Sequence, residues 1–323
     1  MSSILKIGPL NLNEVAESAD QYDLGIVMVG YESRGVAVVG ELGQKISQII
    51  AYEYQHNQVL SFQENLAYLQ HVGALVVPLS ERENSDDLRS RVDTARSLQK
   101  SEDRAGPLRI AVDISSMDRD QIGRTLSTLD GHEASIIADF FYSLGVYTEG
   151  LIGSEGLVVV NRAVEGFEGW TTDPTLPLVC LVGCGFESQL ALAAVETLEP
   201  SHSIWLLPRG EDERYYDTVM ERNRLLIEDS GTQPNEYDVL DPYNTLVKLE
   251  ATTASLLTQS RVVLVPIGPK IFALECMLTA LAHEDNVSVW RLSADDQRTA
   301  EDREASGTII GLRVEFRMQG AEG

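Results

Sequence analysis

The sequence is poor in cysteine, histidine and basic residues, and each shortage excludes a class of protein. Three cysteines, Cys180, Cys184 and Cys276, are too few for a disulfide framework in a chain of 323 residues. The five histidines and three cysteines show no metal-ligand spacing, so we expect neither a metal nor a cofactor. Lys and Arg number 25 against 50 Asp and Glu, and this net charge of −25 argues against direct binding of duplex nucleic acid.

Long hydrophobic runs are missing as well. No apolar run approaches about 18 residues, so we expect no membrane span. Residues 1–12 lack the basic and apolar regions of a signal peptide, and the simplest expectation is a cytoplasmic protein. The chain has 43% hydrophobic and 23% charged residues, which is a globular composition, and its length predicts about two domains.

Short apolar runs alternate with segments of helical spacing along most of the chain. In the first half, strands are expected at 24–29, 74–78, 108–114 and 134–142, and helices at 33–54, 85–98 and 118–129. In the second half, strands are expected at 178–182, 203–207, 236–240, 262–266 and 287–292. Helices are expected between them at 190–198, 213–229, 245–257 and 270–282. Such alternation predicts parallel α/β sheets.

Other segments depart from this alternation. Residues 145–164 contain a glycine-rich turn and predict an antiparallel excursion, 295–305 predict a charged loop or frayed helix, and 308–316 predict an edge strand. Residues 166–177 (GFEGWTTDPTLP) are typical of a linker. We therefore expect two tandem Rossmann-like lobes, residues 1–165 and 178–323, with mainly parallel sheets and antiparallel additions at the ends.

The two halves also repeat a pair of motifs in the same order. Gly30-Tyr31-Glu32-Ser33 follows the first strand of half one, and Gly185-Phe186-Glu187-Ser188 follows the first strand of half two. Further along, residues 109–129 resemble residues 261–281 at nearly the same spacing. This pattern predicts a duplication whose lobes are related by a pseudo-twofold. The alternative is that two Rossmann-like sheets simply share the strand-turn-helix order.

The repeated motifs fall at strand-to-helix turns, beyond the carboxyl ends of strands, where open parallel sheets bind ligands. In the second half, Gly268 permits close approach of the backbone, Pro269 suits the first helical position, and Lys270 adds a cation. The helix dipole disfavours a cation at that end, so a bound phosphate or carboxylate would account for Lys270. The alternative is a lysine that extends into solvent or pairs with an acidic side chain.

The corresponding turn of half one offers other donors. Ser115 and Ser116 can cap the following helix or donate to a phosphate, with capping the favoured role for Ser116, and Arg119 supplies a fork of donors. Glu32 and Glu187 either stabilise a helix N-terminus or bind sugar hydroxyls or base edges. The candidate ligand-binding set is therefore Gly30, Glu32, Ser115, Ser116, Arg119, Gly185, Glu187, Ser188, Gly268, Pro269 and Lys270.

Missing motifs disfavour two enzyme classes. The sequence has no G-x-x-x-x-G-K-[ST] loop, which disfavours a P-loop NTPase. Neither first-strand turn has G-x-G-x-x-G, and in the second one Ser188 stands where the last glycine belongs. A redox dinucleotide enzyme is therefore disfavoured. Cys184 has no recognisable histidine base, so we expect a buried, inert thiol there.

The four turns resemble those of the CRISPR-associated Rossmann-fold sensor domains, namely the CARF domains and the related two-lobed SAVED domains. Gly268-Pro269-Lys270 and Ser115-Ser116-Met117 stand where that family carries a small, polar, lysine-containing turn, which begins a helix and holds the phosphates of cyclic oligonucleotides. The resemblance implies a non-catalytic sensor or adaptor subunit that binds an anionic small molecule or nucleotide. We expect no appended nuclease or transcription-factor domain, so the resemblance also implies action through a protein partner and a role in prokaryotic antiviral defence.

Two alternatives stay open. An enzyme acting on a nucleotide or phosphorylated substrate would use Glu32 or Glu187 as its general base, although no nucleophile–base pair is recognisable. A structural scaffold subunit of a defence complex would keep the same turns without binding a ligand.

Overall fold

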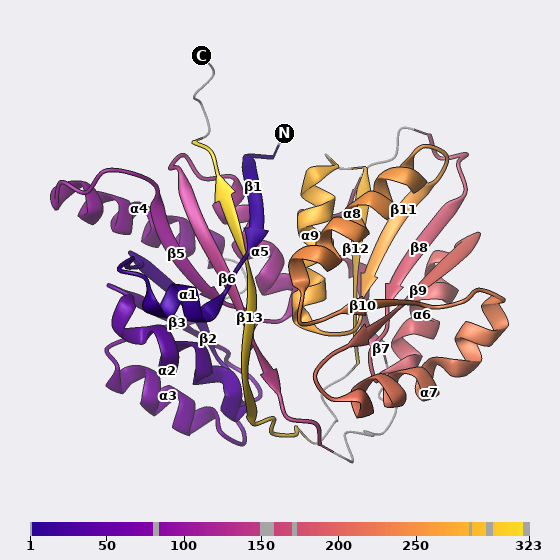
Figure 1. Ribbon diagram of the computed structural model, residues 1–323, viewed down its shortest axis with the longest axis horizontal. Coiled ribbons are helices and arrows are strands. Elements are labelled where there is room, and N and C mark those ends of the chain that lie inside the picture. The colour runs from indigo at the N-terminus through magenta and orange to yellow at the C-terminus, as the bar shows by residue number, and fades with distance from the viewer. Residues whose placement is uncertain are drawn as a thin grey trace. The chain divides into compact units, whose positions relative to one another are not determined.

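The computed structural model describes residues 2–79, 84–148, 158–169, 173–283, 286–294 and 300–318. The chain forms two compact units: unit 1 comprises Met1–Val146 and Ala300–Gly323, and unit 2 comprises Tyr147–Thr299. Each unit contains one mostly parallel β-sheet interleaved with helices (Figure 1). The expected α/β class with two Rossmann-like lobes is therefore confirmed.

The sheet of unit 1 has seven strands in the order β1-β13-β6-β5-β2-β3-β4. Its strands are β1 (Ile4–Pro9), β2 (Leu24–Val29), β3 (Ile49–Glu53), β4 (Leu75–Pro78), β5 (Leu108–Asp113), β6 (Ile136–Gly145) and β13 (Ala305–Phe316). Its helices are α1 (Leu12–Glu17), η1 (Ser33–Val36), α2 (Ala37–Leu42), η2 (Gly43–Lys45), α3 (Phe62–His71), α4 (Asn84–Ser101) and α5 (Arg119–Asp130). Among the described strand pairs of this sheet, β13 runs antiparallel to both of its neighbours, β1 and β6, and the other pairs are parallel.

The sheet of unit 2 has six strands in the order β10-β9-β8-β11-β12-β7. Its strands are β7 (Val158–Ala163), β8 (Leu178–Gly183), β9 (His202–Arg209), β10 (Asn235–Asp238), β11 (Arg261–Pro266) and β12 (Val287–Ala294). Its helices are α6 (Ser188–Leu198), α7 (Glu213–Ser230), α8 (Pro242–Leu257) and α9 (Lys270–Ala282). Only β7 pairs antiparallel, at the end of the sheet beside β12.

The two sheets repeat one strand order. Reading from β4 gives β4-β3-β2-β5-β6-β13 in unit 1, and reading from β10 gives β10-β9-β8-β11-β12-β7 in unit 2, each with an antiparallel sixth strand. Gly30 and Gly185 therefore follow equivalent strands, β2 and β8, as the sequence repeat predicts. In unit 1, β3 and β4 lie on one side of β2, and the next strand in the chain, β5, lies on its other side. In unit 2, β9 and β10 lie on one side of β8, and β11 lies on its other side. Such switch points are where open α/β sheets bind ligands.

The expected helix at 33–54 is wrong over its second half. Helical structure ends at Lys45, and the next element in the chain is β3, which lies between β2 and β4 in the sheet. The first four residues of β3, Ile49 to Tyr52, are all buried, so the strand is a continuous apolar run without polar alternation. Periodicity alone does not separate such a run from a buried helical segment. The same error hid α3, which follows β3.

The expected edge strand at 308–316 is also corrected. β13 lies between β6 and β1, so unit 1 contains the C-terminal strand together with residues 2–146. The described part of the expected linker, 166–169 and 173–177, belongs to unit 2: Val289 N–H donates to the Phe167 carbonyl, and Arg261 N–H to that of Pro177, both at 2.9 Å. The compact units thus divide the chain at Val146 and near Ala300, not at the expected boundaries of 165 and 178.

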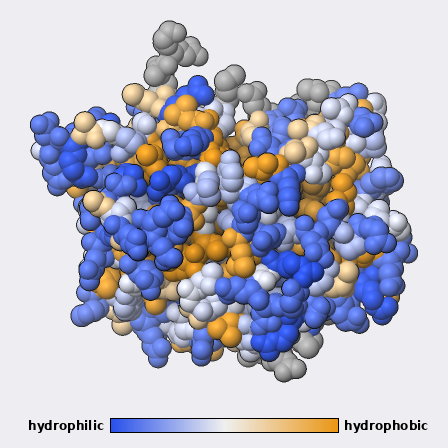
Figure 2. Space-filling model, viewed as in Figure 1, coloured by the Kyte–Doolittle hydropathy of each residue, from blue (hydrophilic) through white to orange (hydrophobic). Residues whose placement is uncertain are grey.

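Each sheet packs helices against both faces. In unit 1, Val15 of α1 and Leu42 of α2 share a cluster with Phe141 of β6, whereas α4 packs beside α5. In unit 2, α6 and α7 share a core around Trp205, and α8 packs along α9. Hydrophilic residues cover the outer faces of α4 and α7 in Figure 2. None of the described helices is long and apolar enough to span a bilayer.

Candidate functional site

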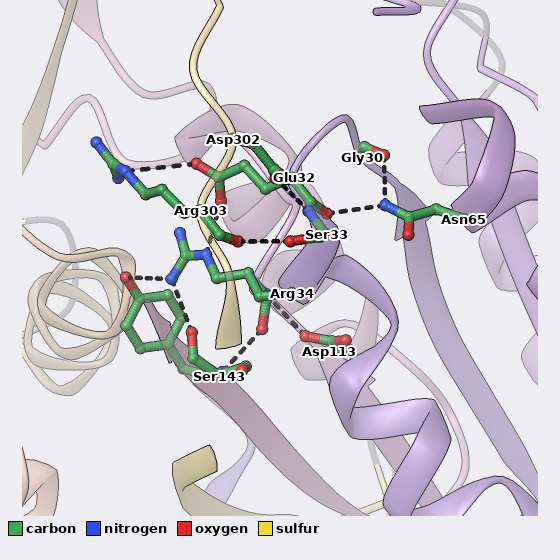
Figure 3. Close-up of polar contacts among 11 residues, drawn as sticks. Gly30, Glu32, Ser33, Arg34, Asn65, Asp113, Ser143, Asp302 and Arg303 are labelled. Carbon is green, nitrogen blue, oxygen red and sulfur yellow. Dashed lines mark hydrogen bonds and ion pairs between the residues drawn. The ribbon is translucent and has the colours of Figure 1, made fainter. Parts of the chain in front are cut away.

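In unit 1, the turn after β2 lies directly against the turn after β5. A Cβ atom on Gly30 would stand 2.3 Å from Ser116 Oγ, so only glycine permits this approach. Asn65, a buried residue of α3, holds the turn from the other side: its Nδ2 donates to the carbonyls of Gly30 at 3.0 Å and Glu32 at 2.8 Å. The turn is therefore fixed by contacts from two other elements, and Figure 3 shows the contact of Asn65 with Gly30.

A buried arginine occupies the centre of this turn. Arg34 is 2% exposed, and its Nε donates to Glu32 Oε2 at 2.7 Å. Its Nη1 donates to the Ser143 carbonyl at 2.7 Å and to the Tyr142 hydroxyl at 3.3 Å. Burial acts to lower the pKa of Arg34, but the neighbouring Tyr142 and Glu32 outweigh burial and raise it. Glu32 therefore accepts from a permanent cation and makes no side-chain cap on η1.

The serines of the β5 turn do not cap α5, which corrects the role favoured for Ser116. The N-cap of α5 is Asp118, whose side chain accepts from Gln121 N–H at 2.8 Å, because α5 begins only at Arg119. Ser115 is buried; its N–H donates to Asp113 Oδ1 and its Oγ accepts from Ser143 N–H, both at 2.8 Å. Ser116 instead faces Gly30 and Gly35.

In unit 2, the turns after β8 and β11 meet in the same way. A Cβ on Gly268 would stand 2.5 Å from the Cys184 carbonyl oxygen, and one on Gly185 would stand 3.1 Å from the Ile267 oxygen. Ile267 N–H and Gly268 N–H both donate to the Gly183 carbonyl, at 2.9 and 3.0 Å. Two glycine turns are therefore packed together at the switch point of the sheet.

Helix α9 begins at this junction. Pro269 is its N-cap, whereas the sequence predicted Pro269 as the first helical residue. The first helical residue is Lys270, which is half-buried. The Pro269 side chain makes no capping hydrogen bond, whereas the Asp118 side chain caps the equivalent helix α5. Arg119 opens α5 as Lys270 opens α9, so both units place a cation at the same position of the fold.

In both units an asparagine holds the glycine turn. It comes from the helix that follows the next strand of the sheet, which is α3 after β3 and α7 after β9. Asn223 of α7 is fully buried, and its Nδ2 donates to the Gly185 carbonyl at 2.9 Å. Asn65 makes the same bond to Gly30. Our sequence reasoning missed Asn65 and the equivalence of the two asparagines. The spacing from glycine to asparagine, 65 − 30 = 35 and 223 − 185 = 38, is the signal that pairs them.

Half-buried aromatic rings lie beside the Gly185 turn. Phe186 stacks on Tyr215 with ring centroids 5.5 Å apart, and Tyr147 meets Tyr215 edge-on at 5.0 Å. Arg214 lies over the Tyr147 ring at 4.7 Å. Aromatic faces beside a cationic helix start are chemically suited to a ligand that combines a flat ring with an anionic group.

The remaining predicted residues of unit 2 lie on the same edge of the sheet. Glu187 is the N-cap of α6 without a side-chain capping bond, and Ser188 is the first residue of that helix. Cys184 is buried, and burial raises the pKa of its thiol to about 12, which confirms the expected inert cysteine. Within the described ranges, no group of three or more His, Cys, Asp or Glu side chains is placed to hold a metal ion.

Neither a family model nor a curated protein matches this sequence.

Proposed function

We propose that this protein is a non-catalytic sensor or adaptor whose unit 2 binds an anionic ligand, a nucleotide, at the start of α9. The observation that carries the proposal is the pairing of Lys270 with a helix N-terminus that Pro269 leaves without a side-chain cap. An exposed cation at this end costs roughly 0.3–1 kcal/mol, and an anion there reverses the sign. Charge-assisted hydrogen bonds to a phosphate contribute about 1.5–3 kcal/mol each.

Features around Lys270 support a nucleotide over a simple anion. The close contact of Gly268 with Cys184 brings the α9 turn against the turn that carries Phe186. Phosphate groups would lie at Gly268 to Lys270, and the stacked pair Phe186–Tyr215 would offer a face to the base.

Glu32 gives little support to the enzyme alternative. Its carboxylate accepts from Arg34 and lies 3.7 Å from Arg303 Nε, so two arginines already occupy the group that would act as the base. The thiol of Cys184 is protonated at neutral pH, because burial raises its pKa.

The scaffold alternative differs only in predicting that no ligand binds. The resemblance of the four turns supports a place in antiviral defence, which the neighbouring genes test.

The test is a thermal-shift screen of the wild-type protein against mononucleotides, dinucleotides and cyclic oligonucleotides, followed by hydrogen exchange with the strongest stabiliser. At a hundredfold excess over Kd, a ligand stabilises the native state by about 2.7 kcal/mol. We expect slower exchange at residues 267–272 and in the Gly185 turn. A screen without any stabiliser, or protection confined to other elements, contradicts the proposal.

A further inference from the structure

The segment 300–304 crosses the carboxyl edge of unit 1 and supplies acceptors to the turn after β2. Asp302 Oδ1 accepts from Ser33 N–H at 2.6 Å, and Asp302 Oδ2 accepts from the Ser61 hydroxyl at 3.3 Å. The Arg303 carbonyl accepts from Arg34 N–H at 3.2 Å and from the Ser33 hydroxyl at 3.3 Å. Two successive backbone N–H groups and two hydroxyls thus donate to one short segment. Figure 3 shows Ser33 beside this segment.

Asp302 adds a second carboxylate beside two arginines that share one glutamate. Arg34 Nε bonds Glu32 Oε2 at 2.7 Å, and Arg303 Nε lies 3.7 Å from Glu32 Oε1, so two arginines share one glutamate. Asp302 supplies the second negative charge. Without it, these linked side chains hold one more cation than anions, beside donors that already point at an oxygen.

This is the way in which proteins bind a free carboxylate or phosphate: backbone N–H groups and hydroxyls surround the oxygens, and nearby arginines supply the charge. We propose that Asp302 is an internal ligand and that residues 300–304 form a strap over an anion site of unit 1, whose donors are the Ser33 N–H and the Ser61 hydroxyl. A carboxylate or phosphate takes that site when the Asp302 side chain is removed. The inference concerns unit 1 and is independent of the ligand proposed for unit 2.

The strap is the direct continuation of β13, which holds it in place. Val146 N–H donates to the Glu304 carbonyl at 2.9 Å, and Ala305 pairs with Gly145. Trimming the Asp302 side chain leaves these backbone bonds intact. The substitution therefore opens the donors of Ser33 and Ser61 without freeing the strand.

The test compares Asp302→Ala with Glu301→Ala, which removes the same charge from the exposed neighbouring position. Melting temperatures are measured in sodium acetate, sodium phosphate and sodium chloride at equal ionic strength. Asp302→Ala is expected to melt lower than the wild type in chloride, and acetate or phosphate is expected to restore at least half of the loss with a saturable dependence. Wild type and Glu301→Ala show no such rescue. The more effective anion identifies the site as carboxylate- or phosphate-selective.

A second readout follows the Ser33 amide by NMR during a phosphate titration. Phosphate is expected to shift this amide in Asp302→Ala at concentrations at least tenfold below those needed in the wild type. Asp302→Asn, which keeps an acceptor oxygen and the fold, is expected to fall between them. Equal phosphate binding by wild type and both Asp302 variants overturns the proposal, as does a complete lack of rescue and of saturable shifts in the two variants.

Discussion

Buried polar side chains determine much of the local chemistry of this protein, and His132 is a titratable example. It is 3% exposed, its Nδ1 accepts from Ala134 N–H at 3.0 Å, and its Nε2 lies 3.2 Å from Asp93 Oδ1. Burial lowers the pKa of His132 below its ordinary 6.5, and Arg89 acts in the same direction against the opposing Asp93. Protonation of Nδ1 would also break the bond from Ala134. The native state therefore favours the neutral ring.

The lowered pKa of His132 determines how the free energy of unfolding changes with pH. The unfolded chain takes up the proton more readily than the native state, so His132 contributes stability above pH about 6.5 that is lost as the pH falls toward the native-state pKa. His132→Asn keeps an acceptor for Ala134 and removes the titration. The urea midpoint of this variant is expected to fall less between pH 7.5 and 5.5 than that of the wild type. The exposed control His56→Asn should follow the wild type, and parallel curves for all three would refute the assignment.

At the scale of elements, a buried ion pair sets the register of the C-terminal strand. Arg313 of β13 stands directly opposite Asp139 of β6 and donates to both of its carboxylate oxygens at 2.7 Å. The Tyr22 hydroxyl also donates to Asp139 at 2.6 Å, and burial together with Asp139 raises the pKa of Tyr22. A one-residue slip of β13 would separate Arg313 from Asp139, which is fully buried.

Removing this carboxylate is therefore expected to be costly. Asp139→Ala leaves Arg313 and Tyr22 without their partner, and we expect a loss of about 3–5 kcal/mol in the free energy of unfolding. Glu315→Ala is the matched control on the same strand, because its pair with Lys6 is largely exposed and contributes no more than about 1 kcal/mol. Urea denaturation measures both. Equal losses for the two variants would show that the buried pair does not hold β13.

The elements that the sequence predicted well are those with a clear boundary signal. β2, β5, β8 and β11 end in glycine, aspartate or proline turns, and the expected strands end within one residue of the observed ones. The element β3 was missed because its run of buried residues has no polar alternation. Because β3 was missed, α3 and its residue Asn65 were missed too. The contact of Asp302 with Ser33 could not be predicted, because the two residues are 269 positions apart in the sequence. Pairings over such distances leave no local pattern.

At the scale of the whole molecule, the chain completes unit 1 only at its end. β13 lies between β1 and β6, and it carries the strap that contacts the β2 turn. All described strands of unit 2 lie between Val158 and Ala294, so its sheet does not use the C-terminal segment. Integrity of unit 1 therefore depends on a strand that follows unit 2 in the sequence.

Truncation tests this dependence. In a chain that ends at Ala294, β6 loses its antiparallel neighbour and β1 loses its partner in the sheet, so unit 1 is expected to lose its cooperative fold. Hydrogen exchange should become fast in β2, β5 and β6, while β8 and β11 keep their protection. Retained protection throughout β2, β5 and β6 would contradict the described role of β13.

The central claim, that Lys270 at the start of α9 belongs to an anion site, is tested most directly by ligand titration of three variants. Lys248→Ala removes an exposed lysine of the neighbouring helix α8 and serves as the control. With the strongest nucleotide stabiliser, Lys270→Ala and Lys270→Glu are expected to lose the ligand-induced rise in melting temperature, and Lys248→Ala to retain it. Without ligand, Lys270→Ala should melt at or slightly above the wild-type temperature, because a cation at a helix N-terminus is unfavourable. Undiminished stabilisation of Lys270→Ala by the nucleotide would contradict the claim.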